Sequence, residues 1–251
     1  MLHKLTISAS SEIGLVRKNN QDSYFTSPQN GLVVVADGMG GHNGGEIASE
    51  IAVTGISDEL LQQQWENTSD EMEILLKLGE SVEKANLLIR QKANLNAELT
   101  GMGTTVVAAL FISSRVFLAH VGDSRIYRFR DNKLELMTRD HSLVQQLVDT
   151  GVFVDVKEAE AAGIGSNVLT RGLGIEDQVE VDVTDEQLQP GDQYLFCSDG
   201  LTAMVNDQDL EKLLIQYQKD METAVERLVV GAMTAGGLDN ITVVLARPEL
   251  D

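Results

Sequence analysis

Four aspartates each stand beside a run of apolar residues, although they are far apart in the chain. Asp37, Asp123 and Asp199 follow such runs, and Asp239 precedes one, in Asp239-Asn-Ile-Thr-Val-Val. Apolar runs of this kind predict buried strands, and rigid strands can hold carboxylates in fixed relative positions. Carboxylate and carbonyl oxygens are the ligands that Mg2+ and Mn2+ prefer. The pattern therefore predicts a divalent-cation site where the ends of these strands meet.

Glycine follows two of these aspartates, at Gly38 and Gly200, and the pairs have two interpretations. An Asp-Gly pair after a strand is more often a simple turn than a metal ligand. Glycine also permits close backbone approach, so the Gly38 carbonyl oxygen could reach an ion. Clustered buried carboxylates are costly unless cations neutralise them, a requirement that independent turns would not have. The sequence alone leaves open whether the aspartates converge.

The glycine-rich stretch over residues 37–45 matches neither common phosphate-binding loop. It lacks the Lys followed by Ser or Thr of a P-loop, and Asn43 stands where a dinucleotide fingerprint starting at Gly38 needs glycine. The stretch leads into an expected helix, so anion binding at the start of that helix stays open.

Hydrophobic periodicity predicts the elements that position these residues. Apolar residues recur every three to five positions over 45–64 and 69–98, as in amphipathic helices. The mixed segment over 142–165 predicts one short helix and an acidic stretch. Further helices are expected at 207–218 and 221–234, and strands at 5–9, 32–36, 104–112, 115–121, 125–130, 133–137, 179–183, 194–198 and 241–246. Short connections between neighbouring strands predict antiparallel pairing, and grouped strands with paired helices predict the α+β class rather than alternating βαβ units.

Composition and charge narrow the class of protein. The net charge of −20, from 19 basic and 39 acidic residues, would repel nucleic acid and anionic membranes. The single cysteine, Cys197, excludes an internal disulfide and lies in an apolar run typical of a core position. The N-terminus lacks the apolar stretch of a signal peptide, and no run is long enough to cross a bilayer. We therefore expect a cytoplasmic protein with no membrane or nucleic-acid partner.

Taken together, these motifs resemble the metal-dependent protein phosphatases of type 2C, in particular the short bacterial and cyanobacterial members. Each fragment is weak alone, but the joint pattern covers nearly the whole chain and is highly specific. The matching segments, in the family's order and at its usual spacing, are residues 17–22, 37–42, 103–105, 122–125, 140–142, 169–171, 198–201 and 237–242.

The resemblance implies a four-layer α-β-β-α arrangement, in which two packed antiparallel sheets are flanked by helix pairs. It implies one catalytic domain over residues 1–251, with a variable flap at about 145–166 in which substrate preference would lie. We also expect a monomer.

The resemblance also implies a metal centre that holds Mg2+ or Mn2+. By matching position, Asp37 would bridge two ions, the Gly38 carbonyl would bind the second ion, and Asp199 and Asp239 would complete the first. Asp123, together with Asp199, matches the ligands of an additional, weaker third ion.

Three further residues match catalytic positions of the family. Arg17 would hold the phosphate, because a planar guanidinium donates two parallel hydrogen bonds. His42 would protonate the departing alkoxide, and Asp22 would orient metal-bound water. These parts imply hydrolysis of phosphoserine and phosphothreonine in phosphorylated proteins, by in-line attack of a water that bridges the two ions.

Other interpretations of the same residues stay open. Outside this motif, Arg17 beside Lys18 would be a solvated surface pair. His120 lies in an apolar strand and is expected to be structural, and Arg171 is expected to be structural rather than catalytic. His141 could have a capping or packing role, or could lie near the site.

Two other functions fit parts of the same pattern. A catalytically inactive domain that kept the fold ranks far lower, because every expected metal ligand, the arginine and the histidine are present. A metal-dependent phosphoesterase that acts on nucleotides or small phosphorylated metabolites would have similar catalytic parts.

Overall fold

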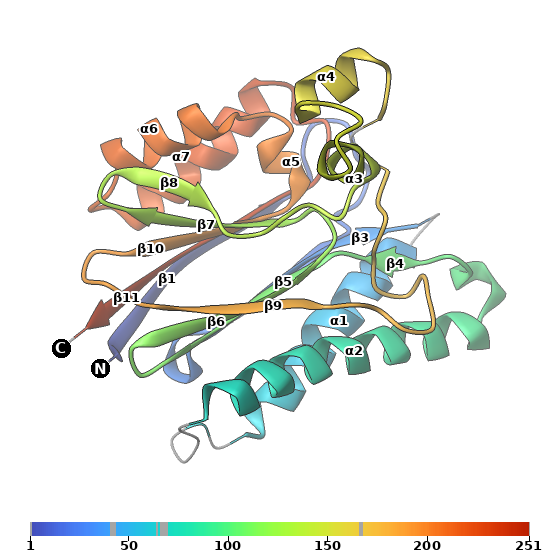
Figure 1. Ribbon diagram of the computed structural model, residues 1–251, viewed down its shortest axis with the longest axis horizontal. Coiled ribbons are helices and arrows are strands. Elements are labelled where there is room, and N and C mark those ends of the chain that lie inside the picture. The colour runs from blue at the N-terminus through green and yellow to red at the C-terminus, as the bar shows by residue number, and fades with distance from the viewer. Residues whose placement is uncertain (1, 41–43, 64, 66–69, 166–167, 251) are drawn as a thin grey trace.

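Two antiparallel β-sheets pack face to face, and helices cover both outer faces (Figure 1). The computed structural model describes residues 2–40, 44–63, 65, 70–165 and 168–250. The predicted α+β class, with layers in the order α-β-β-α, is confirmed by this arrangement. Among the described residues, no helix combines the length and apolar character that a bilayer crossing needs.

The first sheet joins the two ends of the chain. Its strands, in spatial order, are β1 (Leu2–Glu12), β11 (Ile241–Leu250), β10 (Gln193–Cys197), β7 (Arg125–Arg130) and β8 (Lys133–Leu136). All neighbouring strands pair antiparallel, as predicted. The N- and C-termini therefore lie side by side at one end of the molecule (Figure 1).

The second sheet carries the first of the aspartates. Its strands, in spatial order, are β2 (Asp22–Ser27), β3 (Leu32–Met39), β5 (Val106–Ile112), β6 (Arg115–Val121) and β9 (Asp182–Gln187), with β4 (Gly103–Thr104) paired to β3. The run Leu32–Ala36 is apolar throughout because both of its faces are buried. Val33 and Val35 pack between the sheets, whereas Val34 packs under the helices.

Helices bury one face each against the outer side of a sheet. Over the second sheet lie α1 (Gly44–Leu61) and α2 (Glu71–Leu95), and over the first sheet lie α5 (Asp199–Thr202), α6 (Asp207–Gln216) and α7 (Met221–Thr234). Asp70 begins α2 by accepting a hydrogen bond from the Met72 amide, which satisfies one of the free donors of the first turn. The expected helices thus form within a few residues of their predicted bounds.

Several segments differ from the sequence-based expectations. The segment over 142–165 forms two short helices, α3 (Leu143–Asp149) and α4 (Val156–Ala161), rather than one. β1 and β11 extend beyond their predicted bounds. β9 begins three residues after its predicted start, because Val179 and Val181 pack against the core before the strand begins. The half-exposed edge strand β2 has no expected counterpart, because its sequence is mostly polar.

Candidate active site

The aspartates that are distant in sequence line one cavity. Its volume is about 260 Å3, and its walls include Arg17, Asp37, Gly38, Asp123, Asp199 and Asp239. Each carboxylate enters from a different element: β3, the turn from β6 to β7, the start of α5, and the residues just before β11. The convergence that the sequence left open is therefore observed.

Asp37 lies inside β3, not after it, and its backbone is locked in place. Its amide donates to Thr105 Oγ1 at 3.1 Å, and its carbonyl accepts from the Thr105 amide at 2.9 Å and from Thr104 Oγ1 at 2.8 Å. The side chain is half-buried at the wall of the cavity. These contacts fix where the carboxylate stands before any ion binds.

Asp22 faces Asp37 across the ladder of β2 and β3. Ser198 Oγ donates to Asp22 Oδ2 at 2.7 Å, and the same hydroxyl accepts from the Thr242 amide at 3.0 Å. This bond runs from the first sheet to the second, because Ser198 follows β10. Oδ1 of Asp22 is buried with no hydrogen-bond partner.

Arg17 forms an ion pair with Asp239, with 2.5 Å between Nη2 and Oδ2. The side chain of Asn240 holds the loop that carries Arg17. Its Nδ2 donates to the backbone carbonyls of Ile13 and Asn19, and its Oδ1 accepts from the backbone amide of Gln21. Asn240 is 4% exposed, so these bonds are shielded from water. The sequence predicts no role for Asn240, although it lies within the matching segment 237–242.

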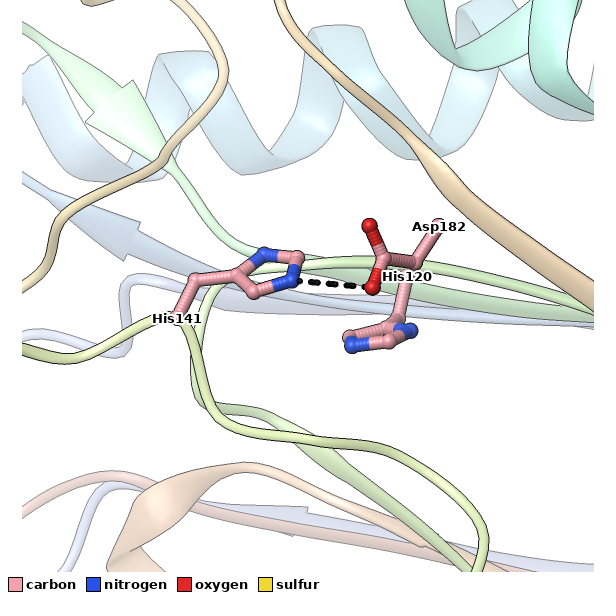
Figure 2. A group of neighbouring side chains, drawn as sticks. All are labelled: His120, His141 and Asp182. Carbon is pink, nitrogen blue, oxygen red and sulfur yellow. Dashed lines mark ion pairs between the residues drawn. The ribbon is translucent and has the colours of Figure 1, made fainter. Parts of the chain in front are cut away.

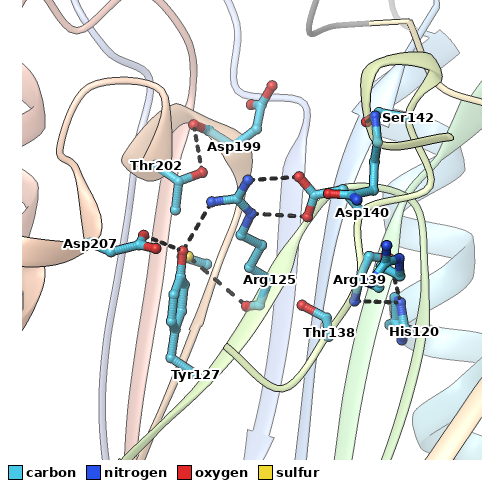
Figure 3. A network of polar contacts seen from close by, with 12 residues as sticks. His120, Arg125, Tyr127, Thr138, Arg139, Asp140, Ser142, Asp199, Thr202 and Asp207 are labelled. Atoms are coloured by element: carbon cyan, nitrogen blue, oxygen red, sulfur yellow. Dashed lines mark hydrogen bonds and ion pairs between the residues drawn. The ribbon is translucent and has the colours of Figure 1, made fainter. Parts of the chain in front are cut away.

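Arg125 is a half-buried cation near Asp199 (Figure 3), and its charge lowers the pKa values of Asp123 and Asp199. Its Nε and Nη2 donate to the two oxygens of Asp140 at 2.9 and 2.7 Å, which forms a bidentate pair. Nη1 also donates to the Tyr127 hydroxyl at 3.1 Å. The positive charge of Arg125 lowers the repulsion between the aspartates. Its guanidinium does not line the cavity, because it is paired with Asp140.

Burial and mutual repulsion raise the pKa values of the clustered carboxyls. Burial, followed by the charges of Asp22 and Asp199, raises the pKa of Asp37 well above its usual value. Burial, followed by the charges of Asp199 and Asp140, raises the pKa of Asp123 to about 7. Burial raises the pKa of Asp22 to about 6. Without a cation, the cluster therefore binds protons near neutral pH.

The donor set fits divalent cations. Among the described residues, Oδ1 of Asp199 and Oδ1 of Asp22 are two of three buried side-chain polar atoms with no partner. An unpaired oxygen among like charges is costly, and a hard divalent cation would satisfy the unpaired oxygen of Asp199. Gly38 has a separate reason to be glycine, because a Cβ there would lie 2.1 Å from the Gly45 carbonyl oxygen. Its carbonyl as a ligand stays a prediction.

A second cluster lies outside this cavity. In the described ranges, the one group of three His, Cys, Asp or Glu side chains with ligand atoms within 4.8 Å of one another is His120, His141 and Asp182 (Figure 2). The guanidinium of Arg171 already contacts this group, 2.8 Å from Asp182 and 3.3 Å from His141 Nε2. His42, the predicted general acid, lies outside the described residues.

A family model described as protein phosphatase 2C matches residues 16–230. The serine/threonine phosphatase stp of Listeria welshimeri is 39% identical over 240 residues, which are 94% of this chain and 93% of that protein. The serine/threonine protein phosphatase PstP of Mycobacterium tuberculosis is 38% identical over 242 residues, which are 96% of this chain and 45% of that protein.

Solved structures of similar proteins have the same fold. The crystal structure of Mycobacterium tuberculosis PstP superposes with a TM-score of 0.88 and 36% identity, covering 98% of this chain and 99% of that chain. The catalytic domain of PstP in complex with two manganese ions gives a TM-score of 0.85 and 36% identity, covering 99% of both chains. Both likenesses extend over nearly the full length of the chain.

The raised pKa of Asp123 predicts how the stability of the metal-free protein depends on pH. Because the pKa in the folded state, about 7, exceeds the usual 3.8, ionisation of Asp123 lowers the free energy of unfolding as pH rises from about 4 to 7. Asp123→Asn should therefore raise the Tm of the metal-free protein at pH 8 by roughly 2–8 °C, for a gain of about 1–2 kcal/mol, and by little at pH 4.

Calorimetry in EDTA measures this difference, and Asp58→Asn, an exposed carboxyl on α1, is the matched control. A metal-free Asp123→Asn protein that melts below the wild type at pH 8 would contradict the electrostatic account of the site.

Proposed function

This chain belongs to the protein phosphatase 2C family and is a metal-dependent serine/threonine phosphatase, and from that premise we propose which of its residues carry the reaction. The observation that supports the proposal is one cavity lined by Asp37, Asp123, Asp199 and Asp239, in which Oδ1 of Asp199 has no protein partner. Within the described part of the chain, Arg17 is the one cationic residue that lines it. Divalent cations would balance this excess of negative charge.

The ligands divide between the ions as the family pattern assigns them. Asp37, the Gly38 carbonyl, Asp199 and Asp239 would hold the two core ions, and Asp123 together with Asp199 would hold a weaker third ion. The cofactor is Mg2+ or Mn2+, and a relative, PstP, has been crystallised with two manganese ions.

When bound, the ions supply an activated water for attack on phosphorus and neutralise charge on the phosphoryl oxygens. Arg17 binds the substrate phosphate: its pairing with Asp239 places the guanidinium at the cavity rim, where a phosphate can accept two of its hydrogen bonds. Asp22 uses Oδ2 to accept from Ser198 and keeps Oδ1 free to accept a hydrogen bond from water, which orients that water. His42 donates a proton to the leaving serine or threonine oxygen.

The substrates are phosphorylated proteins. The net charge of −20 disfavours nucleic acid as a partner. Cleavage of a phosphothreonine peptide at a higher kcat/KM than nucleotides would support this assignment, and the reverse order would favour a small-molecule phosphoesterase. The single domain with a flap at about 145–166, the monomeric state and the cytoplasmic location stay predictions from the sequence.

Removal of one ligand charge tests the metal assignment. Asp37→Asn and Asp239→Asn should each lower kcat/KM for a phosphothreonine peptide by about 1,000-fold, because each removes transition-state stabilisation worth roughly 4 kcal/mol. Far-ultraviolet circular dichroism should be unchanged, since amide and carboxyl groups have nearly the same shape. Asp58→Asn removes one exposed charge and should keep wild-type activity. Retention of more than a tenth of the activity by Asp37→Asn would refute the assignment.

The role of His42 is tested by changing the leaving group. His42→Gln should slow a phosphoserine peptide by about 100-fold, because serine alkoxide leaves poorly without a proton. The same variant should slow p-nitrophenyl phosphate less than about tenfold, since p-nitrophenolate needs no proton. Single-turnover rates on both substrates with saturating Mn2+ measure the difference, and equal losses would exclude general-acid catalysis by His42.

A further inference from the structure

His141 and Gly122 bind each other through two hydrogen bonds. The His141 amide donates to the Gly122 carbonyl at 2.9 Å, and the Gly122 amide donates to His141 Nδ1 at 3.1 Å. His141 is 7% exposed, so water competes little for these bonds. Gly122 directly precedes Asp123. We propose that His141 is a positioning residue that fixes Asp123 for the weaker third ion, an inference that rests on the proposed role of Asp123.

The turn that carries Asp123 needs an anchor on each side. Gly122 has φ +104°, and a Cβ there would lie 2.6 Å from the Thr105 side chain, so glycine is required. Glycine also has the greatest backbone freedom, and contacts must supply the rigidity. Ser124 Oγ lies 2.6 Å from Thr105 Oγ1 on one side, and His141 holds Gly122 on the other. Both neighbours of Asp123 in the chain, Gly122 and Ser124, are therefore held by buried hydrogen bonds.

The hydrogen bond from Gly122 sets the tautomer of His141. Since Nδ1 accepts from the Gly122 amide, the ring proton lies on Nε2. Nε2 lies 3.4 Å from Asp182 Oδ2, which accepts from it (Figure 2). Arg171 Nη1, 3.3 Å from Nε2, donates instead to the other oxygen of Asp182 at 2.8 Å. Stacking of His120 on His141, with ring centroids 4.7 Å apart, fixes the plane of the ring.

The side chains of this cluster already have protein partners. Nδ1 of His141 is occupied by Gly122, and Nε2 of His120 lies 2.9 Å from the Arg139 carbonyl oxygen. The guanidinium of Arg171 supplies the positive charge beside Asp182. Of these contacts, the bond between Gly122 and His141 is the one that holds the turn.

Two amide substitutions separate the acceptor from the bulk of the side chain. The Oδ1 of His141→Asn occupies the place of Nδ1 and can still accept from Gly122, whereas His141→Gln places its amide near the Nε2 position. His141→Gln should weaken the lowest-affinity Mn2+ site about tenfold, and His141→Asn should stay within about threefold of the wild type. Electron paramagnetic resonance of free Mn2+, titrated without substrate, measures this binding.

The Gly122 amide gives a readout that is independent of metal. In metal-free protein, hydrogen exchange at Gly122 should be at least tenfold faster in His141→Gln than in the wild type, and close to the wild type in His141→Asn. Equal exchange in the wild type and His141→Gln would overturn the proposed contact.

A double-mutant cycle tests whether His141 acts through Asp123. In an Asp123→Asn background, His141→Gln should cause no further loss of Mn2+ binding, and an equal tenfold loss there would overturn the inference in favour of a general structural role. Equal damage by His141→Asn and His141→Gln would overturn it too. Unchanged Mn2+ binding by Asp123→Asn alone would overturn the ligand assignment of Asp123, and this inference with it.

Discussion

Repulsion between buried carboxylates is the constraint on which this site depends. Asp37 is half-buried and stands close enough to Asp22 and Asp199 for their charges to raise its pKa. A fold gains nothing from such a cluster in itself, because each added negative charge raises the cost of the others. The cost is offset when cations or protons enter, so ion binding and folding stability are linked in this protein.

The two-sheet architecture makes that unfavourable cluster possible. Asp37 comes from the second sheet, whereas Asp199 and Asp239 flank strands of the first sheet. Buried hydrogen bonds connect the sheets at this end, and the bond from Ser198 to Asp22 is one of them. Asp37 lies in a strand, and the other three aspartates each lie two residues from a strand end, so the carboxylates have little freedom to move apart and relieve their repulsion. The geometry of the site therefore depends on the packing of the two sheets.

Much of this organisation can be predicted from the sequence. Apolar periodicity locates the main strands and helices, and the aspartates beside those strands indicate the metal site. The edge strand β2 is missed, because its residues are mostly polar and half-buried and show no clear alternation. The roles of Asn240 and His141 are also missed, since they act through hydrogen bonds to the backbone of residues distant in sequence. Pairings of that kind leave no periodic signal, and only the folded arrangement reveals them.

The central claim is that divalent cations replace protons on the buried aspartates, and it can be tested by calorimetric titration of metal-free protein with Mn2+. Titration at pH 7 in two buffers with different ionisation enthalpies counts the protons released with each ion. The account predicts two tightly bound ions and release of at least about one proton, because the pKa of Asp37 is raised well above its usual value. Tight Mn2+ binding without proton release, or no tight binding at all, would contradict it.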